Sequence, residues 1–285
     1  MQFPDNDTQT DAPENCLTEE QMAFLDKIPE MKTSSRTEYR GRDERKAAQY
    51  QETDETVLQC KGVYKSYNNI PALYDVNLSV RAGGVVGLLG PNGSGKSTLI
   101  KLAMGMLQPT TGEILVCGQK PSPLTKQQTA YLPDTPHLPR WMTVEQAFSY
   151  VADFFPDFRF DRANDFLARL GISPKQRLRT LSKGNLEKVC LISTMARDAK
   201  LYILDEPIAG VDPAARDFIL DTVISNKPEG STILLCTHLI ADIEPVLSHA
   251  VFLNRGKIVL DRDVEEIYEE ENKSLDELFR EVFRW

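Results

Sequence analysis

From residue 57 onward, apolar residues recur in the patterns of strands and helices. Apolar and polar residues alternate in "DVNLSVRAGG" (75–84), which predicts a half-buried antiparallel strand. Continuous apolar runs that end in glycine or polar residues are typical of strands buried in a parallel sheet, and they occur at 85–90, 201–207 and 232–238. The pattern of "AVFLNRGKIVL" predicts a hairpin that turns at Arg255 and Gly256.

Two helices are predicted from the positions of their apolar side chains. In residues 97–107 these positions follow helical spacing, with Leu99, Ile100, Leu102, Ala103, Met106 and Leu107 on one face. Near the carboxyl end, Ser274 and Glu277 form a capping box ahead of an apolar stripe through Leu275, Leu278, Phe279 and Val282. The first of these helices directly follows the apolar run at 85–90 and a glycine-rich loop.

The middle of the chain is predicted to be helical. A capping box at Thr143 starts one helix, and Gly171 is expected to end another that starts at Asp161. Pro174 behind Ser173 predicts a further helix start. We therefore predict an α/β fold with a mostly parallel sheet as its core, a small antiparallel β subdomain before it, and a helical insert.

Residues 1–55 are polar and mixed in charge, without a strand pattern. A capping box of Thr18 and Gln21 predicts a short amphipathic helix near 18–28 within a partly disordered extension. This helix is expected to be loosely docked, and a docking helix for a partner is the alternative. The predicted division of the chain is an extension at 1–55, a main domain at 56–261 with its helical subdomain at about 136–195, and a helical tail at 262–285.

The composition narrows the class of protein. The chain has 285 residues, 41% of them hydrophobic, so it can bury a sizeable core, and its net charge of −9 argues against an extended nucleic-acid surface. No apolar run is long enough to span a membrane, and the polar, acidic start does not resemble a signal peptide. Free cytosolic thiols are expected because no metal or pairing spacing joins the scattered Cys16, Cys60, Cys117, Cys190 and Cys236.

The glycine-rich loop "GPNGSGKST" has the spacing of a phosphate-binding loop between a strand and a helix. Its glycines let backbone N–H groups turn toward phosphates, and the helix start adds partial positive charge. Lys96 is expected at the β- and γ-phosphates and the Ser97 hydroxyl at Mg²⁺. A chance match is the bland alternative, and the loop does not separate kinases, GTPases and motor ATPases. The candidate nucleotide-binding residues here are Gly90, Pro91, Asn92, Gly93, Ser94, Gly95, Lys96, Ser97 and Thr98.

Acidic residues follow a second apolar strand at the sheet edge where ligands bind. Asp205 can hold a metal through water, and Glu206 points another way, toward an attacking water. An acidic strand end that caps the next helix is the alternative. His238 ends a third strand at the same edge, where it can bond the γ-phosphate, although such a histidine is more often only a satisfied polar residue.

The stretch "TLSKGNLEK" (180–188) reads as a helix start. Ser182 is expected to cap this helix. The Ser-Lys-Gly-Asn start is unusual for a core helix and raises the question of whether this helix end holds an anion.

Taken together, residues 57–261 resemble the ATP-binding subunits of bacterial ABC transporters. The glycine-rich loop is similar to the Walker A motif of this family, and "LYILDEP" is similar to Walker B. "LSKGN" resembles the family signature, usually LSGGQ. The resemblance further implies roles for Asp212 in the D-loop, for His238 as the switch histidine and for Tyr67 as the aromatic residue that stacks on adenine.

Two departures from the family pattern concern the signature and the Q-loop. Lys183 and Asn185 replace a glycine and a glutamine in the signature, while Ser182 and Gly184 are retained. Asp134 occupies the place of the Q-loop glutamine. An aspartate can reach Mg²⁺ through water and adds negative charge beside a triphosphate, so it bears on metal affinity and on coupling. Such variants resemble a bacterial branch associated with export or cell-envelope stress.

The resemblance implies an ATPase that uses ATP and Mg²⁺. Two subunits, identical or different, are expected to close head to tail around two ATP molecules, with Ser182 and Gly184 of one subunit completing the site of the other. A separate transmembrane permease is the expected partner, and the helical insert and the Asp134 loop are expected to contact it. The protein is therefore expected in the cytoplasm, on the inner face of the membrane. The complex is expected to be an exporter. One alternative is an ABC ATPase that acts on nucleic acid or ribosomes, which is disfavoured because the sequence has one cassette, no heptads and no metal-spaced cysteines, so no nucleic-acid partner is expected. The other alternative is a signalling complex.

Overall fold

The computed structural model describes residues 53–208, 216, 219–220, 222–224 and 227–283. All of them lie in one compact unit, Thr37–Trp285. The helix expected near 18–28 lies outside the described residues. The expected limits of the extension, main domain and tail stay predictions.

A small antiparallel sheet precedes the core. It consists of β1 (Thr53–Tyr67), β2 (Ile70–Ala82) and β4 (Thr111–Val116) in the order β2-β1-β4. Buried and exposed residues alternate along β2, as its sequence pattern predicted. Asn68 and Asn69, with φ of 48° and 64°, form the tight turn between β1 and β2.

The main sheet is parallel except at one edge. Its strands are β3 (Val85–Leu89), β5 (Thr129–Leu132), β6 (Leu201–Asp205), β7 (Thr232–Thr237), β8 (His249–Asn254) and β9 (Lys257–Asp263). Their order is β5-β6-β7-β3-β8-β9, and only β9 is antiparallel to its neighbour. The predicted turn at Arg255 and Gly256 is confirmed, with φ of 46° and 79°. Buried side chains fill every position of β3, β6 and β7, which explains their continuous apolar sequences.

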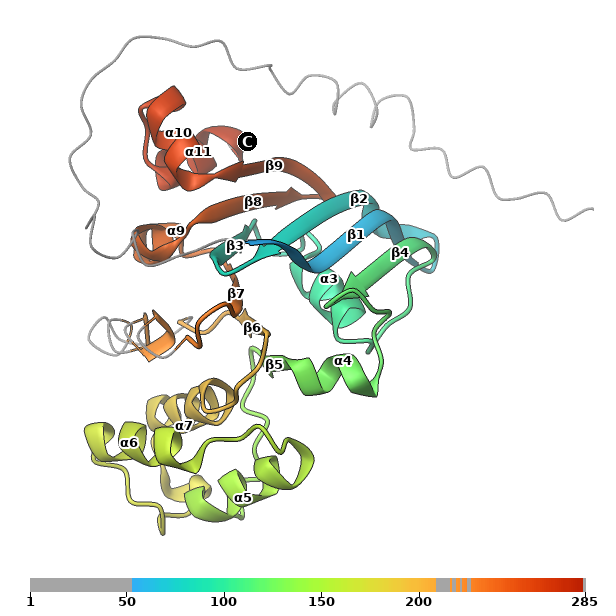
Figure 1. Cartoon of the computed structure of the whole chain (residues 1–285). Coiled ribbons are helices and arrows are strands. Elements are labelled where there is room, and N and C mark those ends of the chain that lie inside the picture. Colours follow the sequence, from blue (N-terminus) through green and yellow to red (C-terminus); the bar gives the residue numbers. More distant parts are fainter. Residues whose placement is uncertain (1–52, 209–215, 217–218, 221, 225–226, 284–285) are drawn as a thin grey trace, which may run out of the picture. The chain divides into compact units, whose positions relative to one another are not determined.

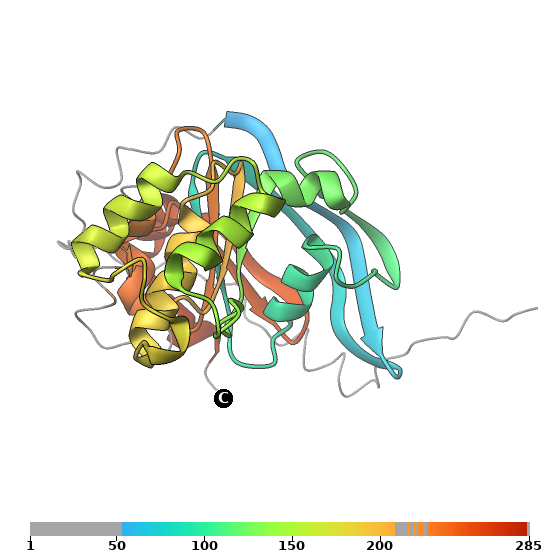
Figure 2. The same cartoon turned by 90° about the horizontal axis from the view of Figure 1, so that it is seen from below.

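Helices cover the sheet in three groups (Figure 1). The first group is α3 (Lys96–Ala103) and α4 (Pro123–Gln128). The insert holds α5 (Val144–Phe154), α6 (Phe160–Leu170), the short 3₁₀ helix η1 (Leu178–Thr180) and α7 (Lys183–Met195). The carboxyl-terminal group is α9 (Ile240–Ile243), η2 (Glu244–Val246), α10 (Val264–Glu271) and α11 (Leu275–Val282). Figure 2 shows the green and yellow insert helices gathered apart from the blue antiparallel strands. The predicted α/β fold is confirmed.

The capping predictions hold at the helices of the insert and tail. Thr143 and Ser274 each form the expected capping box. Gly171, in the left-handed region at φ 64°, ends α6, which begins one residue before the expected Asp161. At each of these helix ends, a cap side chain or a left-handed glycine lets free backbone N–H or C=O groups form hydrogen bonds, and this fixes where the helix begins or ends.

Two helix predictions were wrong. Gly105 adopts φ 63° and turns the chain after Ala103, so Met106 and Leu107 lie beyond α3, and Met106 is 53% exposed. Pro174 begins a turn instead of a helix. The carbonyl oxygens of Pro174 and Gln176 accept bonds from the N–H groups of Glu145 and Val144. They satisfy donors at the start of α5 that have no partner within that helix.

Candidate functional site

The glycine-rich loop connects β3 to α3 at the carboxyl edge of the main sheet. A Cβ atom at Gly90 would lie 2.2 Å from the carbonyl oxygen of Leu253. A Cβ atom at Gly95, where φ is 112°, would lie 2.7 Å from the carbonyl oxygen of Ala72. The loop is also tied to the β8–β9 turn, because the N–H of Gly256 donates to the carbonyl of Ser94 at 2.8 Å. Only glycine therefore fits at Gly90 and Gly95.

Two polar side chains are buried within this loop. Lys96 is 6% exposed, and its ammonium donates to the carbonyls of Gly90 at 2.6 Å and Pro91 at 3.2 Å. The buried hydroxyl of Ser94 has no hydrogen-bond partner among the described residues. No side chain caps α3, which begins directly after Gly95. An uncapped helix start, a buried cation and an unpartnered hydroxyl together fit the oxygens of a phosphate group.

Three carboxylates from two segments, the end of β6 and the loop after β5, meet beside this loop. Asp205 ends β6 and is 4% exposed. Burial, followed by the charges of Asp134 and Glu206, raises the pKa of Asp205 to about 6, while Lys96 and a bond from the Ser97 hydroxyl act in the opposite direction. The structure thus brings together the side chains predicted to hold the metal. A divalent cation would offset this negative charge.

Glu206 is held on three sides. Its backbone adopts φ 51°, which is uncommon outside glycine, and its N–H donates to the carbonyl of Cys236 at 2.7 Å. The Thr237 hydroxyl donates to Glu206 Oε2 at 2.9 Å, and His238 Nδ1 lies 2.9 Å from Oε1. Sequence reasoning found His238 but missed Thr237. The signal available was a hydroxyl beside that histidine, at the end of an apolar strand.

No group of three or more His, Cys, Asp and Glu side chains in the described part of the chain can hold a metal ion. Ser97 and Asp205 would supply two oxygen ligands. This number fits Mg²⁺, because the ion keeps several waters and takes phosphate oxygens beside a few protein ligands.

The start of α7 differs from the phosphate loop. Ser182 caps it, as predicted, by accepting from the N–H of Asn185 at 3.2 Å. A Cβ atom at Gly184 would meet nothing within 4 Å. The exposed Lys183 ammonium lies 3.9 Å from Glu187. Figure 1 shows α7 well apart from α3, so the structure does not bring Ser182 and Gly184 to the phosphate loop of their own chain.

The remaining predicted site residues lie at the edges. Asp134 is exposed after β5 and lines a small cavity together with Glu187 and Glu206. Tyr67, 44% exposed, ends β1, with the Lys65 ammonium 5.4 Å from its ring centre. Asp212 lies outside the described residues. Among the described helices, none is long and apolar enough to cross a membrane.

Comparisons with known proteins identify a family and similar chains. Residues 73–209 match the ABC transporter family model. A manganese transport system ATP-binding protein of Synechocystis is 34% identical over 76% of this chain and 88% of its own length. A peptide export ATP-binding protein of Bacillus subtilis is 28% identical over 80% of this chain and 98% of its own.

Longer relatives and a solved structure extend the comparison. The chain spans 63% and 58% of the length of two uncharacterized ABC transporter ATP-binding proteins, from Nostoc and Synechocystis. The solved structure of an ATP-binding subunit of an ABC transporter matches with a TM-score of 0.72 and 30% identity, over 80% of this chain and all of the other.

Proposed function

The chain belongs to the family of ABC transporter ATP-binding proteins, and we propose that it binds ATP with Mg²⁺ and hydrolyses ATP to power a separate permease subunit. The observation that carries this proposal is the meeting of Lys96, Asp205 and Glu206 at one sheet edge, with Glu206 fixed by Thr237 and His238. A strand end with a purely structural role needs no buried lysine beside two adjacent carboxylates.

Binding is proposed to rest on the phosphate loop and Tyr67. The backbone N–H groups and Lys96 would hold the phosphates, and the Ser94 hydroxyl would find its missing partner there. Ser97 and Asp205 would hold Mg²⁺, with Asp134 reaching it through water. Bound Mg²⁺ supplies positive charge that neutralises the phosphate oxygens. The half-exposed ring of Tyr67 offers a face on which adenine can stack.

Hydrolysis is proposed to depend on Glu206 as the base. A carboxylate oxygen of Glu206 would accept the proton of the attacking water. The hydroxyl of Thr237 takes one lone pair of Oε2, and His238 lies against Oε1, so the carboxylate is held in one orientation. The left-handed backbone at Glu206 costs about 1–3 kcal/mol, a strain that is common at active sites.

The start of α7 is proposed to serve the ATP of a second copy or of a related subunit. Ser182 and Lys183 are exposed, and Gly184 faces open space, so an anion can approach this helix end from outside the chain. The D-loop role that the resemblance implies for Asp212 stays a prediction.

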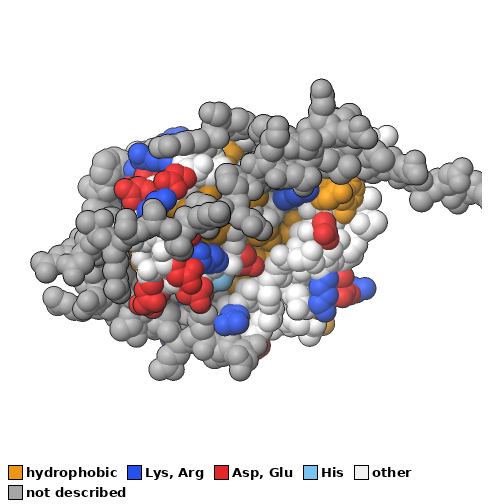
Figure 3. All heavy atoms as spheres, turned by 90° about the horizontal axis from the view of Figure 1, so that it is seen from above, with side chains coloured by type: hydrophobic (Ala, Val, Ile, Leu, Met, Phe, Trp, Pro, Cys, Tyr) orange, Lys and Arg blue, Asp and Glu red, His pale blue; other side chains and the backbone are white. Residues whose placement is uncertain are grey.

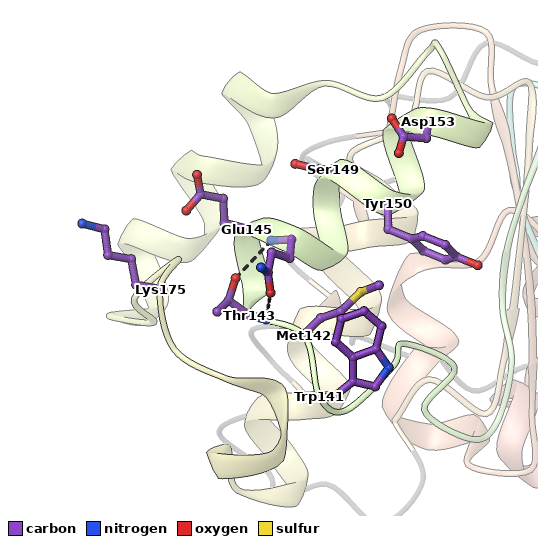
Figure 4. Close-up of a pocket in the computed structure, with 9 residues that line it drawn as sticks. Trp141, Met142, Thr143, Glu145, Ser149, Tyr150, Asp153 and Lys175 are labelled. Carbon is purple, nitrogen blue, oxygen red and sulfur yellow. Dashed lines mark hydrogen bonds between the residues drawn. The ribbon is translucent and has the colours of Figure 1, made fainter.

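A hollow of about 610 Å³ on the insert is the proposed contact with the permease (Figure 4). Trp141, Met142 and Tyr150 lie along it, and Trp141 is 66% exposed. Exposed aromatic side chains of this kind are enriched at protein interfaces. The first residues that line the hollow come shortly after Asp134 in the sequence, and Asp134 lines a cavity with Glu206, so the chain connects the hollow to the candidate site.

The protein is proposed to act on the inner face of the cell membrane through this partner. Export is the proposed direction of transport. It is supported by the similarity to the peptide export ATP-binding protein, of which this chain covers 98% of the length. Copurification of a polytopic membrane protein from detergent extract, and solute flux from reconstituted vesicles, would test this part.

The decisive variant is Glu206→Gln. It should retain ATP binding and lose hydrolysis, because the amide keeps the shape of the side chain but takes no proton. Glu229→Gln, which changes an exposed carboxylate in the loop before β7, is the matched control and should behave as wild type. Brisk turnover in Glu206→Gln would overturn the assignment.

A further inference from the structure

The segment that carries His238 contains only short helices. After Thr237 and His238 bond Glu206, the chain forms α9 and η2, which have four and three residues. We refer to residues 237–246 as the switch segment. Helices this short are not stable alone in water, so the position of the switch segment depends on what packs against it.

Much of that packing comes from the tail. Helix α11 packs against α9. Buried side chains of the two parts belong to one apolar cluster, which includes Ile240, Ile243, Val246, Val264, Ile267, Leu275 and Leu278. Figure 1 shows α9 next to the pair α10–α11 at the end of the main sheet. The tail therefore forms part of the main core.

A single buried carboxylate fastens the two parts together. Glu244 is 8% exposed. Its Oε1 accepts from the Tyr268 hydroxyl at 2.5 Å and from the N–H of Leu275 at 2.8 Å, and its Oε2 accepts from the N–H of Asp276 at 3.4 Å. All three donors belong to the tail, and two of them start α11, where a negative charge is favoured. A buried carboxylate without these donors would be strongly disfavoured.

We propose that the helix pair α10–α11 is a positioning brace for catalysis and that Glu244 is the positioning residue through which it acts. Docking of the tail on Glu244 holds the switch segment, and the switch segment holds His238 and Thr237 against Glu206. The bonds of Glu244 described above all go to the tail, and none of those partners is a residue proposed to bind ATP. This inference rests on the proposed role of Glu206 in hydrolysis.

The brace is accessible at its outer side. Helix α10 exposes Glu265, Glu266, Glu269 and Glu270, while Arg262 of β9 bonds Glu270 and lies 3.5 Å from Glu271. Figure 3 views this face from above and shows acidic and basic side chains close together. None of these side chains is a donor to Glu244, so the tail can be changed at its surface without removing a bond to Glu244.

The test uses full-length variants and two readouts. Glu244→Ala removes the acceptor of all three bonds, and kcat for ATP hydrolysis should fall about ten- to a hundredfold through misplacement of the base, with the affinity for ATP unchanged. Glu244→Gln keeps an oxygen for Tyr268 and Leu275 and should restore most of kcat. Lys273→Ala, which breaks the surface pair of Lys273 with Glu281 at 2.7 Å, is the tail control and should match wild type.

The second readout is independent of activity. The chain has only three histidines, so the ring signals of His238 can be followed by NMR. In Glu244→Ala the His238 signal should move away from its wild-type position as the contact with Glu206 loosens, and in Lys273→Ala it should stay.

Two outcomes separate this inference from the proposed function. A His238 signal and a kcat that both stay at wild-type values in a folded Glu244→Ala protein would overturn the brace. If Glu206→Gln hydrolyses ATP briskly while Glu244→Ala still shifts the His238 signal, the proposed base is wrong and the structural coupling stands. A loss of ATP affinity equal to the loss of kcat would also count against the brace, because a positioning residue spares binding.

Discussion

The amino ends of α3 and α7 both carry a glycine within a polar sequence, and they are built differently. Helix α3 has no side-chain cap and begins beside the buried Lys96 and the unpartnered Ser94 hydroxyl. Helix α7 is capped by Ser182 and begins in the open. The first end fits an anion held within its own chain, whereas the second has satisfied one of its donors and leaves its surface open.

The difference shows why one helix end is embedded and the other is accessible. At α3, backbone from β2 and β8 closes around Gly95 and Gly90, so the loop has one shape before any ligand arrives. At α7, no described residue would lie within 4 Å of a Cβ atom added at Gly184. A site that must be completed by a second subunit needs such an open surface.

The largest expected effect comes from removing the charge at α3. Lys96→Ala should weaken ATP binding by roughly two to three orders of magnitude, because a buried cation that pairs with phosphate is lost. Lys101→Ala removes an exposed lysine from the same helix and should leave affinity unchanged. Calorimetric titration measures the affinity of each variant for ATP. Equal affinities in the two variants would contradict the special role of Lys96 at the start of α3.

Backbone crowding gives the next contrast. Gly90→Ala should lower the free energy of unfolding by about 3 kcal/mol, because its Cβ would collide with the Leu253 carbonyl oxygen. Gly184→Ala should raise it by about 0.5–1 kcal/mol, because alanine favours a helix and meets no neighbour. Urea denaturation of both proteins measures the difference, and similar midpoints would show that the loop is less constrained than its contacts indicate.

Charge at the open helix end should separate binding from turnover. Gly184→Asp should bind ATP as wild type does, since α7 does not contact the phosphate loop, and hydrolysis should fall about a hundredfold through repulsion of the phosphates in the facing site. ATP titration, turnover and the fraction of dimer with ATP are the measurements. Normal turnover would reduce the start of α7 to an ordinary helix cap.

The smallest expected effect concerns the cap. Ser182→Ala should destabilise the protein by about 1 kcal/mol, since the N–H of Asn185 loses its acceptor. Ser182→Asp restores an acceptor and should recover this loss, although its charge should still impair hydrolysis. Thermal unfolding of the two variants tests the cap separately from catalysis.

Local patterns were sufficient for the elements that position the candidate site. The apolar run before the loop, the glycines within it and the helical spacing after it predicted β3 and the start of α3, because each depends on neighbouring residues. The same patterns failed at Met106 and Pro174. At Met106, the left-handed Gly105 ended the helix despite the helical spacing of the apolar residues. At Pro174, bonds to the first N–H groups of α5 outweighed the preference of proline for a helix start.

The sequence by itself determined which residues stand at strand ends, and therefore that Asp205, Glu206 and His238 share one edge of a parallel sheet. Tertiary structure alone decided that Thr237 and His238 form hydrogen bonds with Glu206. These bonds require the strand register that pairs Asp205 of β6 with Cys236 of β7. It also decided that Glu244 meets the start of α11, 31 residues further along. Such contacts depend on how distant segments pack, and a local pattern of apolar and polar residues does not record that packing.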